Sequence, residues 1–413
     1  MHRQNGKHFS WAAKSAAVLL AFALFAFNFS DIMRGVRDMP SAYYAEDGGA
    51  LVQRLGGEAY PSGLTLKAVP ASSSSDQTLG ECGYVECRLF GLPVKRAKAY
   101  IRSRASLVPG GLAVGVSIYT EGVLVVGLGS FEDESGGKVS PASEAGLRAG
   151  DVILSAAEIE ISDSSGLQQV IEANPNGLEL LINRRGTLLR RFVVPAKSGS
   201  GCRIGAWIRD STVGVGTLSF YDEQTGSVAA LGHAVVDADT ETLLSVKDGR
   251  LVLAQVIGVS RGAQGAPGEL HGTFDSSSVL IGDVRENTEL GIYGKAADSA
   301  LELLSGEALP VAFPDEVHTG EATLLATVDT NGAAAYSCRI IKTGAQNEPA
   351  QKGLVVQITD PLLLELTGGI VQGMSGSPIL QDGMLVGVVT HVFVNDPQKG
   401  YGAYAYWMYD ALP

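Results

Sequence analysis

The sequence predicts a mainly β protein with a small helical content, and three observations carry this prediction. Fifty-two glycines and sixteen prolines interrupt short runs of Val, Ile and Leu, a mixture typical of short strands joined by tight turns. Hydrophobic residues make up 45% of the chain and charged residues 18%, which indicates a packed protein and excludes a disordered one. The length of 413 residues allows two or three domains.

Residues 1–30 predict a cytoplasmic tail and a membrane anchor. Three Lys/Arg and no acidic residue precede or flank the apolar run Ser15–Phe29. This run is shorter than the ~20 residues of a spanning helix, but Trp11–Ala13 extend it if Lys14 reaches back to the headgroups. A cleaved signal peptide is the alternative, although no A-x-A site follows the apolar core. The basic flank predicts a single-pass protein with a cytoplasmic amino terminus and an extracytoplasmic remainder.

Residues 31–98 are expected to form a juxtamembrane spacer that leaves room for one small folded element, and the serine-rich stretch 71–78 (ASSSSDQT) indicates flexibility. Cys82 and Cys87 would pair if the compartment is oxidising. No histidine lies near them and their spacing matches no zinc pattern, so we expect no metal and no other cofactor. The net charge of −13 argues against a nucleic-acid partner, since phosphates require a basic face.

Residues 99–198 predict a peptide-binding domain. GVLVVGL (122–128) indicates a strand, Leu167, Val170 and Ile171 have helical spacing, and 178–195 indicates a closing hairpin. SPASEAGLRAGDVI (140–153) resembles a PDZ domain, a fold that captures an extended peptide at a sheet edge. The resemblance implies a peptide ligand and a carboxylate-binding loop at 109–116. The loop residues are Gly110, Gly111, Leu112 and Gly115. An ordinary glycine turn is the alternative for this loop.

Residues 199–413 have the short apolar strands and Gly, Asn and Asp turns of a barrel-like β domain. In VQGMSGSPIL (371–380), glycines 373 and 376 allow a tight turn around Ser375. The turn would direct the amides of Gly373 and Ser375 at one point, as an oxyanion hole requires. This G-x-S-G-x-P form resembles the nucleophile turn of chymotrypsin-like barrels. Ser377 is a weaker candidate, and a structural hairpin remains the alternative.

A serine nucleophile needs a base and a group that orients the base. His233, in SVAALGHAVVDADT, follows an apolar strand and a glycine and is the candidate base. His271, His318 and His391 are expected to be packed or surface residues, and His2 and His8 lie before the apolar segment. Asp360 is the candidate orienting acid, with the alternatives Asp210, Asp237 and Asp239 left open.

Taken together, DSTVGVGTLSFYD, LGHAVVDADT, GAPGELHGTF, ITDPLLLELTGGIVQGMSGSPIL and THVFVNDPQKGYG closely resemble the stage IV sporulation protein B peptidases. The resemblance implies a chymotrypsin-like serine endopeptidase behind a PDZ domain, with His233, Asp360 and Ser375 as its catalytic residues. It implies a protein of the forespore intermembrane space that processes itself and cleaves a membrane-bound regulator of an intramembrane protease, which activates a late sigma factor. The competing hypotheses are a non-catalytic PDZ adaptor with a degenerate protease-like domain and a sheet-rich binder of peptides or cell-wall components.

Overall fold

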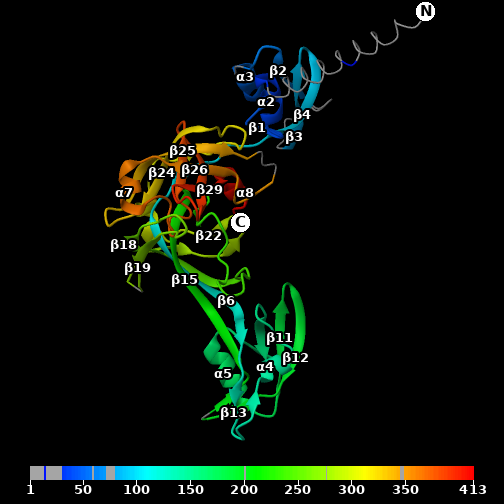
Figure 1. Ribbon diagram of the computed structural model, residues 1–413, viewed down its shortest axis with the longest axis vertical. Coiled ribbons are helices and arrows are strands. Elements are labelled where there is room, and N and C mark those ends of the chain that lie inside the picture. Colours follow the sequence, from blue (N-terminus) through cyan, green and yellow to red (C-terminus); the bar gives the residue numbers. More distant parts are fainter. Residues whose placement is uncertain are drawn as a thin grey trace, which may run out of the picture. The chain divides into compact units, whose positions relative to one another are not determined.

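The computed structural model describes residues 14, 30–57, 60–70, 80–199, 201–275, 277–344 and 348–413 (Figure 1). The predicted membrane segment Ser15–Phe29 and the serine-rich stretch lie outside these ranges. Within them, no helix has both the length and the apolar character needed to cross a bilayer. The prediction of a mainly β chain with few helices is confirmed.

The first compact unit combines the residues up to Arg104 with Phe313–Val317. Its sheet has the order β1-β4-β3-β2, and Leu51, Val85 and Ala97 belong to its buried core. Residues 31–98, expected to be a spacer with room for one small folded element, thus contribute to a folded α/β module with its own core. Its elements are α2 (Asp31–Asp38), β1 (Ala42–Ala45), α3 (Gly48–Gly57), β2 (Leu64–Pro70), β3 (Gly80–Leu89) and β4 (Leu92–Ile101).

The cysteine pairing considered from the sequence does not occur in this module. Cys82 and Cys87 lie five residues apart in the single strand β3, and at about 3.3 Å per residue the strand separates their Cα atoms by more than a disulfide spans. Cys87 is buried and free, as are Cys202 and Cys338.

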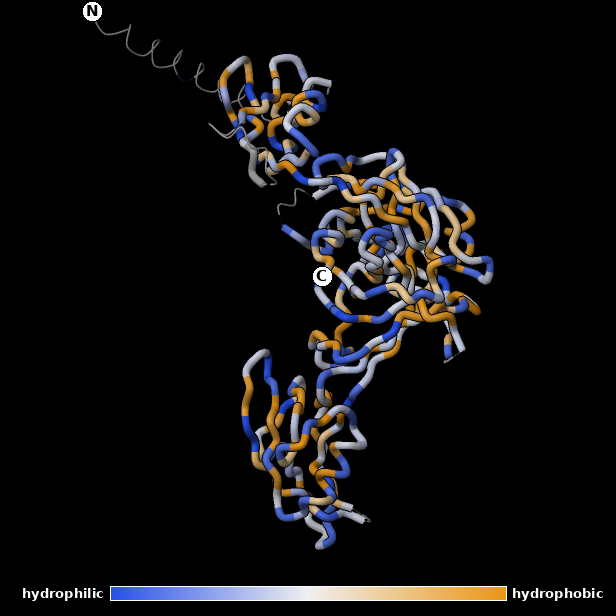
Figure 2. Tube along the Cα trace, turned by 180° about the vertical axis from the view of Figure 1, so that it is seen from behind, coloured by the Kyte–Doolittle hydropathy of each residue, from blue (hydrophilic) through white to orange (hydrophobic). Residues whose placement is uncertain are grey.

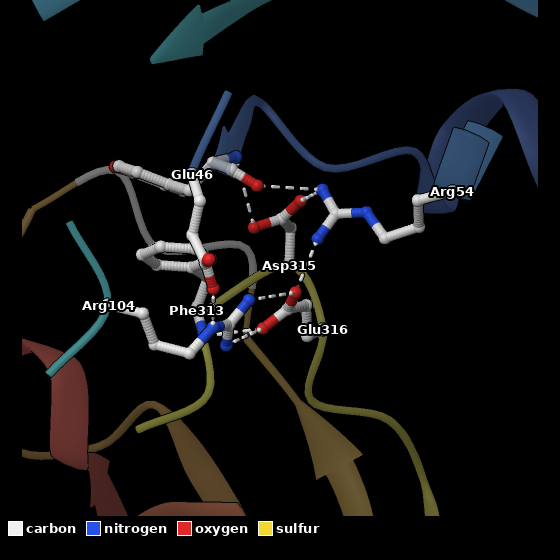
Figure 3. Close-up of polar contacts among 7 residues, drawn as sticks. Glu46, Arg54, Arg104, Phe313, Asp315 and Glu316 are labelled. Atoms are coloured by element: carbon white, nitrogen blue, oxygen red, sulfur yellow. Dashed lines mark hydrogen bonds and ion pairs between the residues drawn. The ribbon is translucent and has the colours of Figure 1, made fainter. Parts of the chain in front are cut away.

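Ion pairs join the segment Phe313–Val317 to the rest of this first unit (Figure 3). The Arg54 guanidinium binds the carboxylates of Asp315 and Glu316. Arg104 makes two hydrogen bonds to Glu316, at 2.8 and 2.9 Å, and a further ion pair with Glu46. Burial raises the pKa of Asp315 to about 7, although the neighbouring Arg54 opposes this shift. The two arginines thus fix a short segment from the carboxyl-terminal half of the sequence onto the amino-terminal module.

The second unit holds Ala105–Ala312, His318–Gly344 and the residues from Glu348 onward. Its larger sheet is built on two long antiparallel strands, β6 (Ala113–Leu128) and β15 (Ala206–Asp222). The main strand order is β12-β11-β9-β6-β15-β16-β22-β21. One buried core of this sheet includes Val123, Ile153 and Leu180, and a second includes Ile118 and Leu218.

The predicted helix and closing hairpin of residues 99–198 are present around the first of these cores. Helix α5 (Ser164–Ala173) buries Leu167, Val170 and Ile171, and β11 (Leu178–Arg184) pairs with β12 (Thr187–Val193). This core begins at Val123 and includes Ile204, so it passes the predicted boundary at 198/199. The other elements around it are β7 (Phe131–Glu132), β8 (Lys138–Val139), α4 (Pro141–Glu144), β9 (Val152–Ala156), β10 (Ile159–Glu160), β13 (Ala196–Ser198) and β14 (Gly201–Arg203).

The predicted carboxylate-binding loop is wrong, because its amides are already paired. The amides of Gly110 and Gly111 donate to main-chain carbonyls of β15 at 3.0 and 2.8 Å, and the carbonyl of Leu112 accepts from the amide of Leu218. Gly115 lies inside β6, which is paired with β15 on one edge and with β17 on the other. A Cβ at Gly110 would lie 2.3 Å from the Leu218 carbonyl oxygen. Glycine is therefore required here for close strand packing rather than for ligand binding.

The remaining strands of the second unit that precede its barrel lie around the second core of the larger sheet or in the connections next to it. The strands are β5 (Ser106–Pro109), β16 (Ser227–Ala230), β17 (Val246–Leu253), β18 (Gln255–Ser260), β19 (Glu269–Thr273), β20 (Leu280–Asp283), β21 (Glu286–Thr288), β22 (Gly291–Lys295) and β23 (Leu309–Pro310). The helical turns η1 (Asp298–Ala300) and α6 (Leu301–Leu304) precede β23.

A closed barrel forms the carboxyl-terminal half, with the strand order β24-β25-β26-β29-β28-β27. Apolar and polar segments are interleaved along the chain (Figure 2), and Leu324, Ile340 and Val388 of the barrel strands are fully buried. The predicted barrel-like β domain is confirmed here. Its elements are β24 (Gly320–Thr327), β25 (Ala333–Thr343), β26 (Leu354–Ile358), α7 (Pro361–Thr367), β27 (Pro378–Gln381), β28 (Met384–Val392), β29 (Lys399–Tyr404) and α8 (Ala405–Asp410).

Candidate active site

Ser375 lies on a tight turn that leads into β27. The turn needs two glycines, because Gly373 and Gly376 have φ angles of 95° and 97°, a region that side-chain-bearing residues rarely adopt. A Cβ on Gly376 would also lie 2.2 Å from the carbonyl oxygen of Thr217. The Ser375 hydroxyl donates a hydrogen bond of 2.8 Å to the carbonyl of Thr390 in β28. In this structure the Ser375 hydroxyl is therefore directed toward β28.

Two backbone amides of this turn are free to bind an anion. The amides of Met374, Gly376 and Ser377 all donate to main-chain carbonyls. Those of Gly373 and Ser375 meet no acceptor among the described residues. Buried or half-buried amides are normally paired, so two unpaired amides on either side of Met374 form the donor set that an oxyanion hole requires.

His233 follows β16 through two residues with positive φ, Leu231 (74°) and Gly232 (71°). Its Nδ1 lies 2.8 Å from the carbonyl oxygen of Ala234. Because a carbonyl oxygen only accepts, Nδ1 carries the hydrogen and Nε2 of the neutral ring keeps its lone pair. Burial lowers the pKa of His233 below its ordinary value, and the bond to Ala234 offsets part of this shift. The ring is therefore in its basic form at neutral pH.

His391 is a residue of this site that reasoning from the sequence missed. Its ring centroid lies 4.9 Å from that of His233, with the two planes at 36°. Burial, together with the neighbouring His233 and Lys352, lowers the pKa of His391 to about 4. The available signal was its position in β28, the second strand after the turn at Ser375.

Ser375, Gly373, His233 and His391 line one cleft of about 570 Å³. Most of its other walls are aliphatic, and none of the residues that line it is an Asp, Glu, Lys or Arg. The cleft borders residues 212–215 of β15, which pair with β6 on one edge and with no described strand on the other. The aliphatic lining comprises Val116, Val215, Leu231, Val235, Val236, Ile370, Val371, Val392 and Val394.

The structure does not bring Asp360 to His233. Asp360 is the N-cap of α7, where its Oδ1 accepts from the amides of Leu362 (3.0 Å) and Leu363 (3.1 Å). Its Oδ2 accepts from the amide of Ser337 at 3.2 Å, and the residue is absent from the cleft lining. The geometry is that of a helix cap, and the predicted contact between Asp360 and the imidazole is not present.

The alternative acids are engaged elsewhere as well. Asp237 and Asp239 bind Arg209, and Asp210 accepts from the amide and hydroxyl of Ser164. None of them lines the cleft. Among the described residues, the hydrogen-bond partner that orients His233 is therefore the main-chain carbonyl of Ala234.

The other polar candidates lie apart from the cleft. Ser377 is fully buried, which removes it as a nucleophile. His271 contacts Ser260 at 2.7 Å, and His318 contacts Asp382 at 2.8 Å. No cluster of three or more His, Cys, Asp and Glu side chains suited to a metal ion occurs in the described ranges.

Comparison with known proteins decides the family. The family model for SpoIVB peptidase S55 matches residues 200–409. The chain belongs to this family. It is a serine peptidase, and the matched segment contains both His233 and Ser375.

Solved structures similar to this S55 peptidase include the active form of the Rv3671c protease from M. tuberculosis. That protein is 16% identical, with 48% of this chain and 72% of that chain covered and a TM-score of 0.27. The inactive form of Rv3671c is 14% identical, with coverages of 48% and 81% and a TM-score of 0.26. No curated protein matches the chain.

Proposed function

We propose that this S55 peptidase is an endopeptidase in which Ser375 is the nucleophile that becomes acylated and His233 serves as general base. The observation that carries the proposal is the single cleft shared by the Ser375 hydroxyl, the His233 ring and the free amides of Gly373 and Ser375. A serine, a base and two oxyanion donors are the groups that acyl transfer requires.

In the proposed mechanism, Oγ of Ser375 turns from the Thr390 carbonyl toward Nε2 of His233. Oγ then attacks the scissile carbonyl carbon while its proton passes to Nε2, and the amides of Gly373 and Ser375 bind the oxyanion. The imidazolium gives this proton to the leaving amine as the peptide C–N bond breaks. Water, activated by the same imidazole, hydrolyses the acyl-enzyme and restores the serine hydroxyl.

The carbonyl of Ala234 takes the part that an aspartate has in a full triad. By accepting from Nδ1, it selects the tautomer whose Nε2 is free to take the serine proton. A neutral carbonyl stabilises the imidazolium less than a carboxylate does. The proposed enzyme is consequently slower than a triad protease, which suits a signalling event that needs few turnovers.

The substrate follows from the family resemblance and is part of the proposal. We infer a protein of sporulation signalling, anchored by Ser15–Phe29, that acts in the forespore intermembrane space. It cleaves itself and a membrane-bound regulator of an intramembrane protease, and so leads to activation of a late sigma factor. The support is the family match together with the basic and apolar amino-terminal sequence.

A second groove supports peptide binding by the PDZ-like region. It has a volume of about 320 Å³ and lies between α5 and residues 203–208. Leu167 and Ile171 contribute apolar walls, and Trp207, which also lines it, is 70% exposed. We propose this groove, instead of the loop at 109–116, as the place where an extended segment of the substrate or of the same chain docks.

The decisive experiment compares the full-length chain with Ser375→Ala and His233→Ala, in self-cleavage and in labelling by a fluorophosphonate probe. Both variants should lose both activities. Ser377→Ala is the matched control, since this neighbouring serine is buried and should leave labelling unchanged. Labelling of Ser375→Ala at the wild-type rate would reject the mechanism, whereas a wild-type chain that never labels would favour the non-catalytic adaptor.

A further inference from the structure

The turn between β3 and β4 exposes an unbroken apolar run. Residues 90–94 read Phe-Gly-Leu-Pro-Val and all five are exposed to solvent. Phe90 and Leu92 are each 71% exposed, and Val94 is 48% exposed. Exposed runs of this length are normally polar, and a contiguous apolar surface marks a site that contacts a partner or a membrane.

The conformation of the turn keeps these side chains outside the module. Phe90 and Gly91 have φ angles of 49° and 83°, as in the tight two-residue turns that join antiparallel strands. The amide of Phe90 donates to the carbonyl of Gly63 at 2.7 Å. A Cβ on Gly63 would lie 2.5 Å from the Phe90 ring, so the absence of a side chain at Gly63 leaves room for this ring. The apolar tip is therefore a rigid feature of the module.

The turn is bonded to the helix that follows the apolar segment Ser15–Phe29. The ammonium group of Lys95 donates to three carbonyls at the carboxyl end of α2, at 2.7 to 3.2 Å: those of Val36, Arg37 and Met39. Helix α2 begins at Asp31 and has eight residues, about 12 Å of axial length. Its first residue comes two positions after the end of the apolar segment. A membrane that holds this segment is thus within reach of the turn.

The charge next to the turn suits an anionic surface. Residues 31–104 together with Phe313–Val317 of the same unit contain ten Lys/Arg and ten Asp/Glu, whereas the rest of residues 105–413 contain eighteen against thirty-four. Next to the turn, Arg88 and Arg96 share the single carboxylate of Glu86, which leaves a net positive charge. Basic residues near a bilayer are attracted by anionic headgroups, and the acidic remainder of the chain is repelled by them.

We propose that the turn Phe90–Val94 inserts into the interfacial layer of an anionic bilayer. Phe90, Leu92 and Val94 enter the boundary between headgroups and acyl chains, while Arg88 and Arg96 contact the phosphates. This second attachment holds the amino-terminal module on the membrane surface. The proposal rests on the proposed anchor and is independent of the chemistry at Ser375.

The test is amide hydrogen exchange on the full-length chain in phosphatidylglycerol nanodiscs, in phosphatidylcholine nanodiscs and in detergent. Exchange at Gly91, Leu92 and Val94 should slow about tenfold in the anionic nanodiscs, because an inserted amide exchanges only when the turn withdraws. The turn at Arg185 and Gly186 is a matched control, since its φ angles are 51° and 83°, and its exchange should not change.

The double variant Phe90→Asn, Leu92→Ser should lose the slowing without unfolding, since asparagine tolerates positive φ. Equal exchange in nanodiscs and detergent overturns the proposal. Slowing in detergent that grows with protein concentration also overturns it, because a second copy of the chain would then cover the turn. Equal slowing in the two lipids overturns the anionic preference. Labelling of Ser375 by the fluorophosphonate probe reports the proposed catalysis separately.

Discussion

Replacing Asp360 distinguishes a helix cap from a catalytic acid. In the present structure, Oδ1 of Asp360 accepts from the amides of Leu362 and Leu363 at 3.0 and 3.1 Å, and Asp360→Asn keeps an oxygen for these two bonds. Asparagine caps a helix as well as aspartate does. The variant loses the second oxygen, which accepts from Ser337, so we expect the free energy of unfolding to fall by about 1 kcal/mol. Asp360→Ala loses all three bonds and should cost about 2 kcal/mol.

Catalysis should respond differently from stability. Because Asp360 does not contact His233, fluorophosphonate labelling of folded Asp360→Asn should stay close to the wild-type rate, whereas loss of an orienting acid lowers catalysis on the order of 10⁴-fold. The assay combines the labelling rate with urea unfolding of the full-length chain. Asp163→Asn is the matched control, since Asp163 caps α5 through the amide of Gly166. An Asp360→Asn variant that unfolds like the control but labels about a thousandfold more slowly would refute the reasoning and restore Asp360 as the orienter.

Four further predictions follow from the site and its surroundings. His391→Phe keeps a ring against His233 and should label within a few-fold of wild type, whereas His233→Phe should label at background; the reverse result would make His391 the base. Burial lowers the pKa of His233, so its imidazole stays neutral to a lower pH than an exposed histidine does. The labelling rate should therefore fall with decreasing pH with a midpoint below 6.5. A midpoint above 6.5 would contradict the assignment of His233 as the base. Arg184→Met leaves the carboxylate of Asp151, whose side chain is 1% exposed, with the Arg148 amide but without its ion-pair partner, and should cost about 3 kcal/mol in urea unfolding; a loss under about 1 kcal/mol would mean that water replaces the arginine. A Cβ at Gly214 meets no atom within 4 Å, so Gly214→Leu should fold but narrow the cleft, raising KM for peptides while probe labelling stays unchanged; an unchanged KM would exclude this edge of β15 from substrate binding.

The parts of the site that sequence could predict are those fixed by local chemistry. Glycines on both sides of Ser375 are needed wherever this turn occurs, and Gly232 before His233 has the same cause, since its Cβ would lie 2.7 Å from Val388. At these positions the residue type alone predicts the backbone conformation. The mainly β fold and the helix at 164–173 could be predicted for a similar reason, because side-chain periodicity reports which face is buried.

The acid and the carboxylate-binding loop could not be predicted in this way. An aspartate before a proline suits a helix cap and an orienting acid equally, and only the approach of Ser337 and α7 makes Asp360 a cap. Gly110 and Gly111 suit an anion nest until β15, about a hundred residues later, takes up their amides. Strand β6 also contributes residues to both cores, and the longest interruption of its apolar residues, 119–122 (YTEG), lies inside one continuous strand, so the sequence does not show there where one core ends.

The neutrality of the cleft links catalysis to substrate binding. In the proposed mechanism, reaction creates an imidazolium on His233 and an oxyanion beside Gly373, in a cleft whose lining has no Asp, Glu, Lys or Arg. The Ala234 carbonyl and the two free amides are the dipoles that stabilise these charges, and dipoles act more strongly when water is absent. The aliphatic walls alone do not keep water out of the empty cleft. An extended substrate lying along residues 212–215 of β15 would displace this water. Binding of the peptide on both sides of the scissile bond is therefore part of the catalytic machinery, and the absence of a side chain at Gly214 keeps that path open.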